Sequence, residues 1–223
     1  MSQNILIVEG EADRGFFEAL CNTLQLGVSV EVAPPKQLGG THNSKEGVFN
    51  LLGTYRRQLN DGTVSRLAII VDADAAEHGQ GFACTLRRVE KIVSEYGFSV
   101  PAAAPTAATA GGCLFQHSDG LNPFGLWIMP NHADDGMLEH WLSECVSQEQ
   151  IALFHHAQAC VDALPTRLFK PLRRAKADIA TWLAWQEKPG EGLYHCVEAG
   201  LLDETAQQYQ ALVSWLRAVF SPT

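Results

Sequence analysis

Acidic residues follow three separate apolar runs of this sequence. They are Glu9 after ILIV, Asp72 and Asp74 after LAIIV, and Asp134, Asp135 and Glu139 a few residues after FGLWIM. Carboxylates brought together repel one another, so a positive partner must offset their charge. Arg14 is the only basic residue within these acidic stretches, so a divalent cation is the expected partner. All-oxygen ligands favour Mg²⁺ or Mn²⁺ over zinc.

The spacing of these acids would bring pairs of them to one side of the chain. Asp72 and Asp74 are two residues apart and would point to the same side of an extended backbone. Glu9 and Asp13 are four apart and would share one face of a helix that begins near Gly10.

Alternating strands and helices must position these acids. Apolar β-branched runs predict strands at 5–8, 28–32, 67–71 and 124–129, and helical periodicity predicts helices at 12–26, 48–59, 82–96 and 137–146, with more helices from 148 onward. The Ala-, Pro- and Gly-rich stretch 100–114 is expected to be a loop. The alternation predicts an α/β fold with a parallel-rich, doubly wound sheet flanked by helices and a helical C-terminal portion. Ligands bind such sheets at the carboxyl ends of the strands, where the acids stand.

The composition is that of a globular protein: 223 residues, 46% of them hydrophobic, with no apolar run long enough to cross a membrane. The six cysteines form no CxxC pair, so a reducing cytoplasmic location is expected. We expect most cysteines and all five tryptophans to lie in the core. The predicted organisation is an α/β domain over 1–146 and a helical extension over 147–223 packed on it.

Basic residues are concentrated in one segment. The net charge is −9, which argues against broad nucleic-acid binding. No Lys or Arg occurs between Lys91 and Arg167, and then RLFKPLRRAK carries five and no acid. Lys170, Arg173 and Arg174 are therefore candidates for binding substrate phosphates. The alternative interpretation is a solvated helix face.

Two motifs carry a family resemblance. LIVEGEAD and IIVDADAA resemble the two signatures of the Toprim domain, which topoisomerases, bacterial primases, small RNA-maturation nucleases and the overcoming-lysogenization-defect (OLD) nucleases share. Two later stretches, GLWIMPNHADDGMLEHWL and KADIATWLAWQEKPGEGL, are similar to small stand-alone Toprim-like proteins of unknown function. The order and spacing of the motifs make the combination specific over residues 4–220. The chain lacks the ATPase, zinc-binding and tyrosine-bearing regions of the larger members, which argues against a topoisomerase or a complete primase.

The resemblance implies a Toprim (Rossmann-like) fold and a set of site residues. The implied catalytic residues are Glu9 and Lys176, and the implied metal ligands are Asp13, Asp72, Asp74 and Glu139. Glu9 matches the glutamate that serves the family as general base or metal ligand. Asp13 and Glu139 match acids of the nuclease-type relatives. Lys170 competes with Lys176 for the place of their late lysine.

The expected function is a Mg²⁺- or Mn²⁺-dependent nuclease acting on DNA or RNA. A small-molecule phosphoryl-transfer or nucleotide-hydrolysing enzyme, and a non-catalytic subunit of a defence or repair complex, remain alternatives, and a homodimer or a partner protein stays open. A receiver domain is disfavoured because its paired acids follow the first strand. Asp134 and Asp135 are interpreted as helix-capping residues. Ser44 and Lys45 are candidate phosphate contacts, although their spacing is not that of a P-loop.

Overall fold

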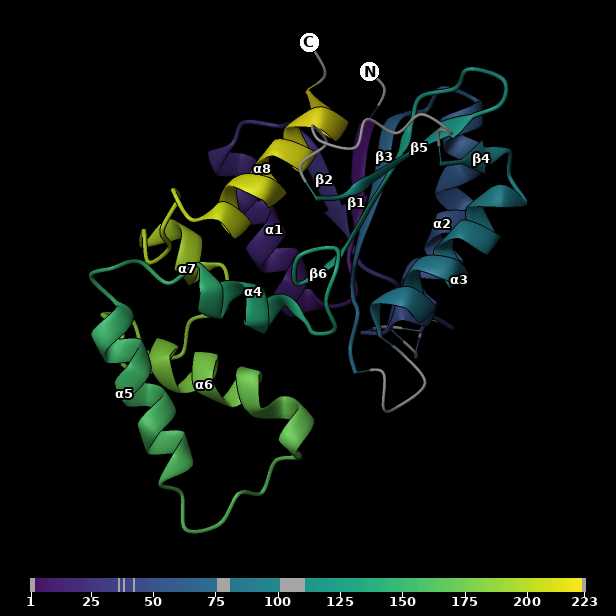
Figure 1. Cartoon of the computed structure of the whole chain (residues 1–223). Helices are drawn as coiled ribbons and strands as arrows, with labels where there is room; N and C mark the ends of the chain where they lie inside the picture. The colour runs from purple at the N-terminus through teal and green to yellow at the C-terminus, as the bar shows by residue number, and fades with distance from the viewer. Residues whose placement is uncertain are drawn as a thin grey trace.

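A six-stranded mixed sheet forms the centre of the molecule (Figure 1). The computed structural model describes residues 3–35, 37, 39–41, 43–75, 81–100 and 111–221. The strands are β1 (Gln3–Ile7), β2 (Val28–Glu31), β3 (Val64–Asp72), β4 (Phe98–Ser99), β5 (Cys113–His117) and β6 (Phe124–Met129), in the order β2-β1-β3-β6-β5-β4. The first four in that order are parallel, and β5 runs antiparallel to β6 and to β4. The predicted parallel-rich α/β sheet is confirmed.

Helices cover both faces of this sheet. They are α1 (Glu11–Thr23), α2 (Lys45–Asn60), α3 (Phe82–Ser94), α4 (Leu138–Glu144), α5 (Ile151–Asp162), α6 (Arg174–Leu183), α7 (His195–Glu198) and α8 (Gln207–Phe220), with a 3-10 turn η3 at Pro171–Arg173. Helices α1 and α8 cover one face and α2 and α3 the other (Figure 1). Strand β6 is buried at every position, as a strand covered on both faces must be. The helices cover the faces of the sheet, so the ends of its strands are where a ligand could reach it.

The C-terminal helices share the core of the sheet. One hydrophobic cluster contains Phe16 of α1, Trp127 of β6 and Trp215 of α8. The ring centroids of Trp127 and Trp215 are 5.6 Å apart. Helices α5 and α6 pack on each other and project beyond the carboxyl ends of the central strands (Figure 1). This helical C-terminal portion is confirmed, whereas the boundary at residue 146 stays a prediction.

Two details differ from the sequence-based expectations. Cys113 and Leu114 belong to strand β5 and not to a loop, while 101–110 lie outside the described residues. A five-residue strand with two outward-facing polar residues gives a weak pattern, which is why the sequence did not reveal it. Trp185 is 39% exposed although the other four tryptophans are buried. Among the described residues no helix is long and apolar enough to cross a membrane.

Candidate functional site

Four carboxylates from different elements meet at the carboxyl edge of the sheet. Glu9 lies just beyond β1, Asp72 is the last residue of β3, and Asp13 and Glu139 lie in the first turns of α1 and α4. Because β1 and β3 are parallel neighbours, their carboxyl ends stand side by side. Each of the other three acids raises the pKa of Asp72 through its charge. We call these four residues the acidic cluster.

Hydrogen bonds tie the cluster to the backbone of three elements. The Asp72 backbone N–H donates to Glu9 Oε1 at 2.9 Å, and Asp72 Oδ1 accepts from the Leu138 N–H at 3.0 Å. Asp13 Oδ2 accepts from the Gly10 N–H at 3.0 Å and thereby caps α1. These carboxylates are therefore held on rigid strand and helix ends, as a preorganised site requires.

One oxygen of the cluster has no partner. Glu139 is only 5% exposed, and its Oε1 accepts from Lys176 Nζ at 2.7 Å. Its Oε2 is buried without a hydrogen-bond partner among the described residues. An unsatisfied buried acceptor costs about 1–3 kcal/mol, so the position calls for a ligand such as a cation or water.

The protonation of the cluster reflects its burial. Burial is the largest cause that raises the pKa of Glu9 to about 7 and that of Asp13 to about 6. The charge of Lys45 opposes the rise at Glu9, and the charge of Glu139 adds to the rise at Asp13. Burial raises the pKa of Asp72 well above its usual range. The metal-free site therefore favours protons, and a cation would compete with them.

Two lysines from distant segments lie against the acids, which the local sequence around the acids did not reveal. Lys45 Nζ donates to Asp74 Oδ2 at 2.6 Å and to the Ala73 carbonyl at 3.1 Å. Lys176 pairs with Glu139. Burial acts to lower the pKa of Lys176, but the charge and hydrogen bond of Glu139 outweigh it and raise that pKa. A divalent cation is therefore not the only positive partner that the fold provides.

The backbone geometry expected for two acid pairs is wrong. Strand β3 ends at Asp72, and Asp74 lies beyond it with φ at 61° and its N–H bonded to the Gly136 carbonyl at 2.7 Å. The period of two stops with the strand, so the alternation of an extended backbone does not place Asp74, although Asp72 and Asp74 both line one pocket. Glu9 precedes α1, which begins at Glu11 after Gly10 as N-cap. Glu9 and Asp13 are therefore not a helical pair, although both reach the cluster.

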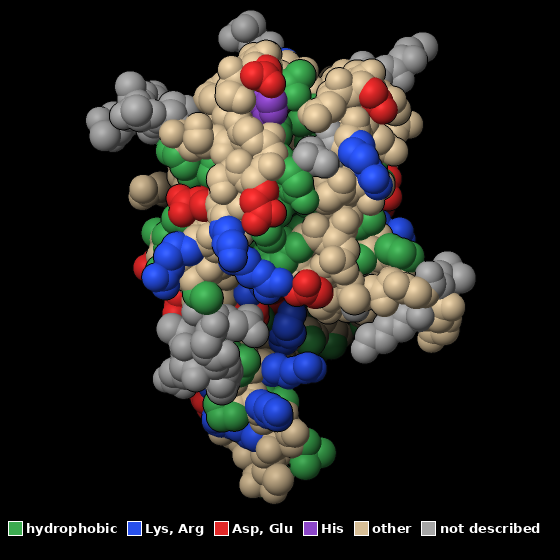
Figure 2. Space-filling view, turned by 90° about the vertical axis from the view of Figure 1, so that its right-hand side faces the viewer, with side chains coloured by type: hydrophobic (Ala, Val, Ile, Leu, Met, Phe, Trp, Pro, Cys, Tyr) green, Lys and Arg blue, Asp and Glu red, His purple; other side chains and the backbone are tan. Residues whose placement is uncertain are grey.

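A pocket of ≈ 370 Å³ opens over the cluster, and Glu9, Asp13, Asp72, Arg173 and Lys176 are among the residues that line it. We call it the acidic pocket. Figure 2 shows Lys and Arg side chains gathered in a band from the middle of the molecule down to its lower lobe, where α5 and α6 lie in Figure 1.

The three predicted phosphate-binding residues have different surroundings. Arg173 lines the acidic pocket, and Lys170 is exposed just before η3. Arg174 instead binds Asp162 on α5 and donates through Nε to the buried Asp178 at 2.7 Å. Arg174 therefore joins α5 to α6.

Nearby polar residues have structural partners. Asp135 Oδ1 accepts from the Phe82 N–H at 2.7 Å, so it caps α3 and not the helix that follows it. Asp134 Oδ2 accepts from the Asn131 side chain. His132 Nδ1 accepts from the Ile128 N–H, and burial lowers its pKa to about 4. His140 Nδ1 accepts from the Met137 N–H. The prediction that Asp134 and Asp135 cap the helix that follows them is therefore wrong, because the N-cap of α4 is Met137.

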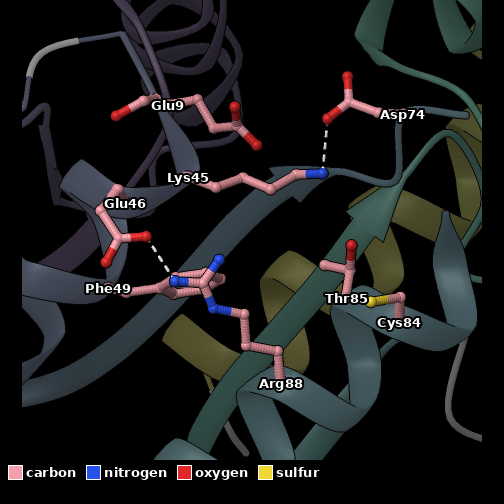
Figure 3. Close-up of a pocket in the computed structure, with 9 residues that line it drawn as sticks. Glu9, Lys45, Glu46, Phe49, Asp74, Cys84, Thr85 and Arg88 are labelled. Carbon is pink, nitrogen blue, oxygen red and sulfur yellow. Dashed lines mark hydrogen bonds and ion pairs between the residues drawn. The ribbon is translucent and has the colours of Figure 1, made fainter. Parts of the chain in front are cut away.

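A second pocket of ≈ 370 Å³, which Lys45 lines, adjoins the acidic pocket (Figure 3). Glu9 and Asp74 line both pockets, and Glu46, Phe49 and Arg88 line only the second. Sequence reasoning missed Phe49 and Arg88 because they lie on two helices far apart in the chain. The start of α2 at Ser44, whose Oγ accepts from the Gly47 N–H at 3.2 Å, is the signal that pointed towards this region.

The oxygen donors suit a hard cation, but their present positions do not form a finished site. Among the residues that the structure describes, no group of three or more His, Cys, Asp or Glu side chains could hold a metal ion as it stands. The unpaired Glu139 Oε2 and the raised pKa values of Glu9, Asp13 and Asp72 fit an ion such as Mg²⁺.

Comparison with known proteins gives a family and one similar fold. The C-terminal region of the Burkholderia pseudomallei OLD protein has 14% sequence identity and a TM-score of 0.48, over 99% of this chain and 100% of that chain. No curated protein matches. The model of the family described as protein of unknown function (DUF3226) matches residues 3–221. This chain therefore belongs to the DUF3226 family.

Proposed function

We propose that this chain is a Toprim-type, metal-dependent nuclease that hydrolyses phosphodiester bonds of DNA or RNA. The observation that carries the proposal is Asp72, which stands at the end of central strand β3, where the charges of Glu9, Asp13 and Glu139 from three other elements act on it. A structural role alone does not explain four acids gathered at one place, because clustered carboxylates destabilise a fold unless something offsets their charge.

The acids have the chemistry to hold Mg²⁺ or Mn²⁺. Asp72 and the unpaired oxygen of Glu139 are the donors that we assign to the ion, with Asp13 beside them. Asp74 would join only after leaving Lys45. When bound, such an ion polarises a phosphoryl oxygen and lowers the pKa of water.

The remaining groups are suited to proton transfer and charge stabilisation. Glu9 has a pKa of about 7, near the value at which a carboxylate accepts a proton from an attacking water at neutral pH. Lys176 stays protonated beside Glu139 and can donate to a phosphate oxygen of the substrate. Arg173 and Lys176 line the acidic pocket beside the acids, which supports a role for their positive charges in holding phosphates that neighbour the reacting one.

The test is cleavage of single- and double-stranded DNA and RNA with Mg²⁺ or Mn²⁺, followed by EDTA. We expect cleavage that EDTA stops, that Asp72→Asn abolishes, and that Glu187→Gln, an exposed acid outside the site, leaves unchanged. Cleavage that continues unchanged in Asp72→Asn would overturn the proposal. Activity confined to small phosphate esters would favour the phosphohydrolase alternative, and an inactive wild-type protein that still binds polymer would favour the non-catalytic subunit.

A further inference from the structure

The second pocket contains a flat cationic surface. The Arg88 guanidinium lies over the Phe49 ring, 4.4 Å from its centroid, and pairs with Glu46 (Figure 3). Phe49 is 7% exposed, so it forms a fixed base for this stack. The Arg88 side chain is 48% exposed. One face of the guanidinium is therefore covered by an aromatic ring while a large part of the side chain remains open to a ligand.

The pocket also has a cation suited to phosphate. The Lys45 side chain is 13% exposed and projects between Glu9 and Asp74, as Figure 3 shows. Glu9 and Asp74 belong to both pockets. The two pockets therefore adjoin, so that a strand occupying both would have one nucleotide over the acidic cluster and a neighbouring one beside Lys45 and Arg88.

We propose that this second pocket is a nucleotide subsite, in which Lys45 contacts the phosphate next to the reacting one and the adjoining base stacks on Arg88. Bases stack on guanidinium planes as they do on aromatic rings. Glu46 and Phe49 hold the guanidinium in one plane, which reduces the entropy lost when a base settles on it. The base must be unstacked from its neighbours, so the substrate class is a single strand, a loop or a frayed end.

The subsite rests on the proposed function for its role but can be measured without cleavage. The probe is a short single-stranded oligonucleotide that carries 2-aminopurine, whose fluorescence falls on stacking, in EDTA. A matched oligonucleotide with an abasic position measures the backbone contribution. We expect the base to strengthen binding by roughly tenfold over the abasic probe, and we expect quenching on binding. A duplex of the same sequence should bind more weakly than the single strand.

Arginine variants separate stacking from charge. We call the ratio of the affinities for the base-containing and abasic probes the base advantage. Arg88→Ala should remove the base advantage, and Arg88→Lys should remove most of it, because lysine keeps the charge but lacks the planar guanidinium. Arg87→Ala is the matched control, since Arg87 lies on the same helix with its Nε bonded to the Ala83 carbonyl of that helix. It should keep the full advantage of the base.

Two results would overturn the subsite. One is an unchanged base advantage in both Arg88→Ala and Arg88→Lys, which would leave Arg88 only as a link between α2 and α3. The other is equal binding of the base-containing and abasic probes by the wild type. Melting temperatures show whether Arg88→Ala is folded. If it is not, the binding of the two probes by Arg88→Lys decides whether Arg88 stacks on the base. If the wild type cleaves nucleic acid but binds both probes equally, the subsite fails and the proposed nuclease stands. If the wild type binds the base-containing probe more tightly but does not cleave, the proposed nuclease fails and the subsite stands.

Discussion

Asp72 and Asp74 are two residues apart, yet they lie in opposite electrostatic surroundings. Asp72 is buried among carboxylates that raise its pKa. Asp74 lies outside the strand and is paired with Lys45 at 2.6 Å. One acid is left in need of positive charge and the other already has it. An Asp-x-Asp motif at a strand end therefore does not by itself define two equivalent metal ligands.

The same contrast appears in the basic segment. Arg173 and Arg174 are neighbours, but Arg173 lines the acidic pocket while Arg174 is bound to Asp162 and Asp178. A charge that already has a partner is costly to redirect to a ligand, whereas an open one is available. Of these two neighbours, Arg173 is therefore the one that we expect to contact the substrate.

The largest expected effect is on cleavage. Asp72→Asn should lower the rate about 10³-fold, since a metal supplies several kcal/mol to the transition state. Asp74→Asn should cost only about tenfold, which corresponds to about 1.4 kcal/mol, because Lys45 already neutralises that carboxylate. Single-turnover rates on a labelled strand measure both. Equal losses would make the two acids equivalent ligands and remove the contrast.

The second effect is on stability against pH in the metal-free protein. Glu9 has a folded pKa of about 7 against an ordinary value of 4.5, so between these pH values the folded state holds more protons than the unfolded chain. The free energy of unfolding should therefore fall as pH rises from 4.5 to 7, on the order of 2 kcal/mol. Urea unfolding in EDTA measures this, and Glu9→Gln should flatten the slope while Glu187→Gln should not. A wild-type protein that gains stability across this window would contradict the burial of an unpaired Glu9.

The neighbouring arginines should separate stability from binding. Arg174→Ala should lower the free energy of unfolding by about 1–3 kcal/mol, because the buried Asp178 loses its charged partner. Arg173→Ala should leave stability nearly unchanged but weaken nucleic-acid binding and reduce its salt slope by about one unit. Denaturant curves and binding at several salt concentrations test the pair. If Arg174→Ala instead weakens nucleic-acid binding and Arg173→Ala lowers the free energy of unfolding, Arg174 is the residue that binds substrate.

Much of the fold followed from local patterns. The runs ILIV, LAIIV and FGLWIM are apolar and β-branched enough to mark buried parallel strands, and the acids after them lie at one edge as expected. Strand β5 was missed because its pattern is short and half exposed. The prediction of Asp13 and Glu139 near Asp72 came from a resemblance, and the structure places both in electrostatic contact with it.

The partners of the acids could not be read from the sequence. Lys45 and Lys176 are far from the acids along the chain, and only the fold brings them together. The left-handed backbone at Asp74 and the stack of Arg88 on Phe49 likewise depend on how α2, α3 and β3 pack. Charge pairing between distant segments is set by tertiary structure, which periodicity does not encode.

The central claim is that the acidic cluster binds a divalent cation through Asp72. Calorimetric titration of Mn²⁺ into the metal-free protein tests it most directly, with Asp72→Asn and Asp74→Asn titrated alongside. We predict saturable binding by the wild type, loss of that binding in Asp72→Asn, and retained though weaker binding in Asp74→Asn. Binding by Asp72→Asn with wild-type affinity would contradict the account.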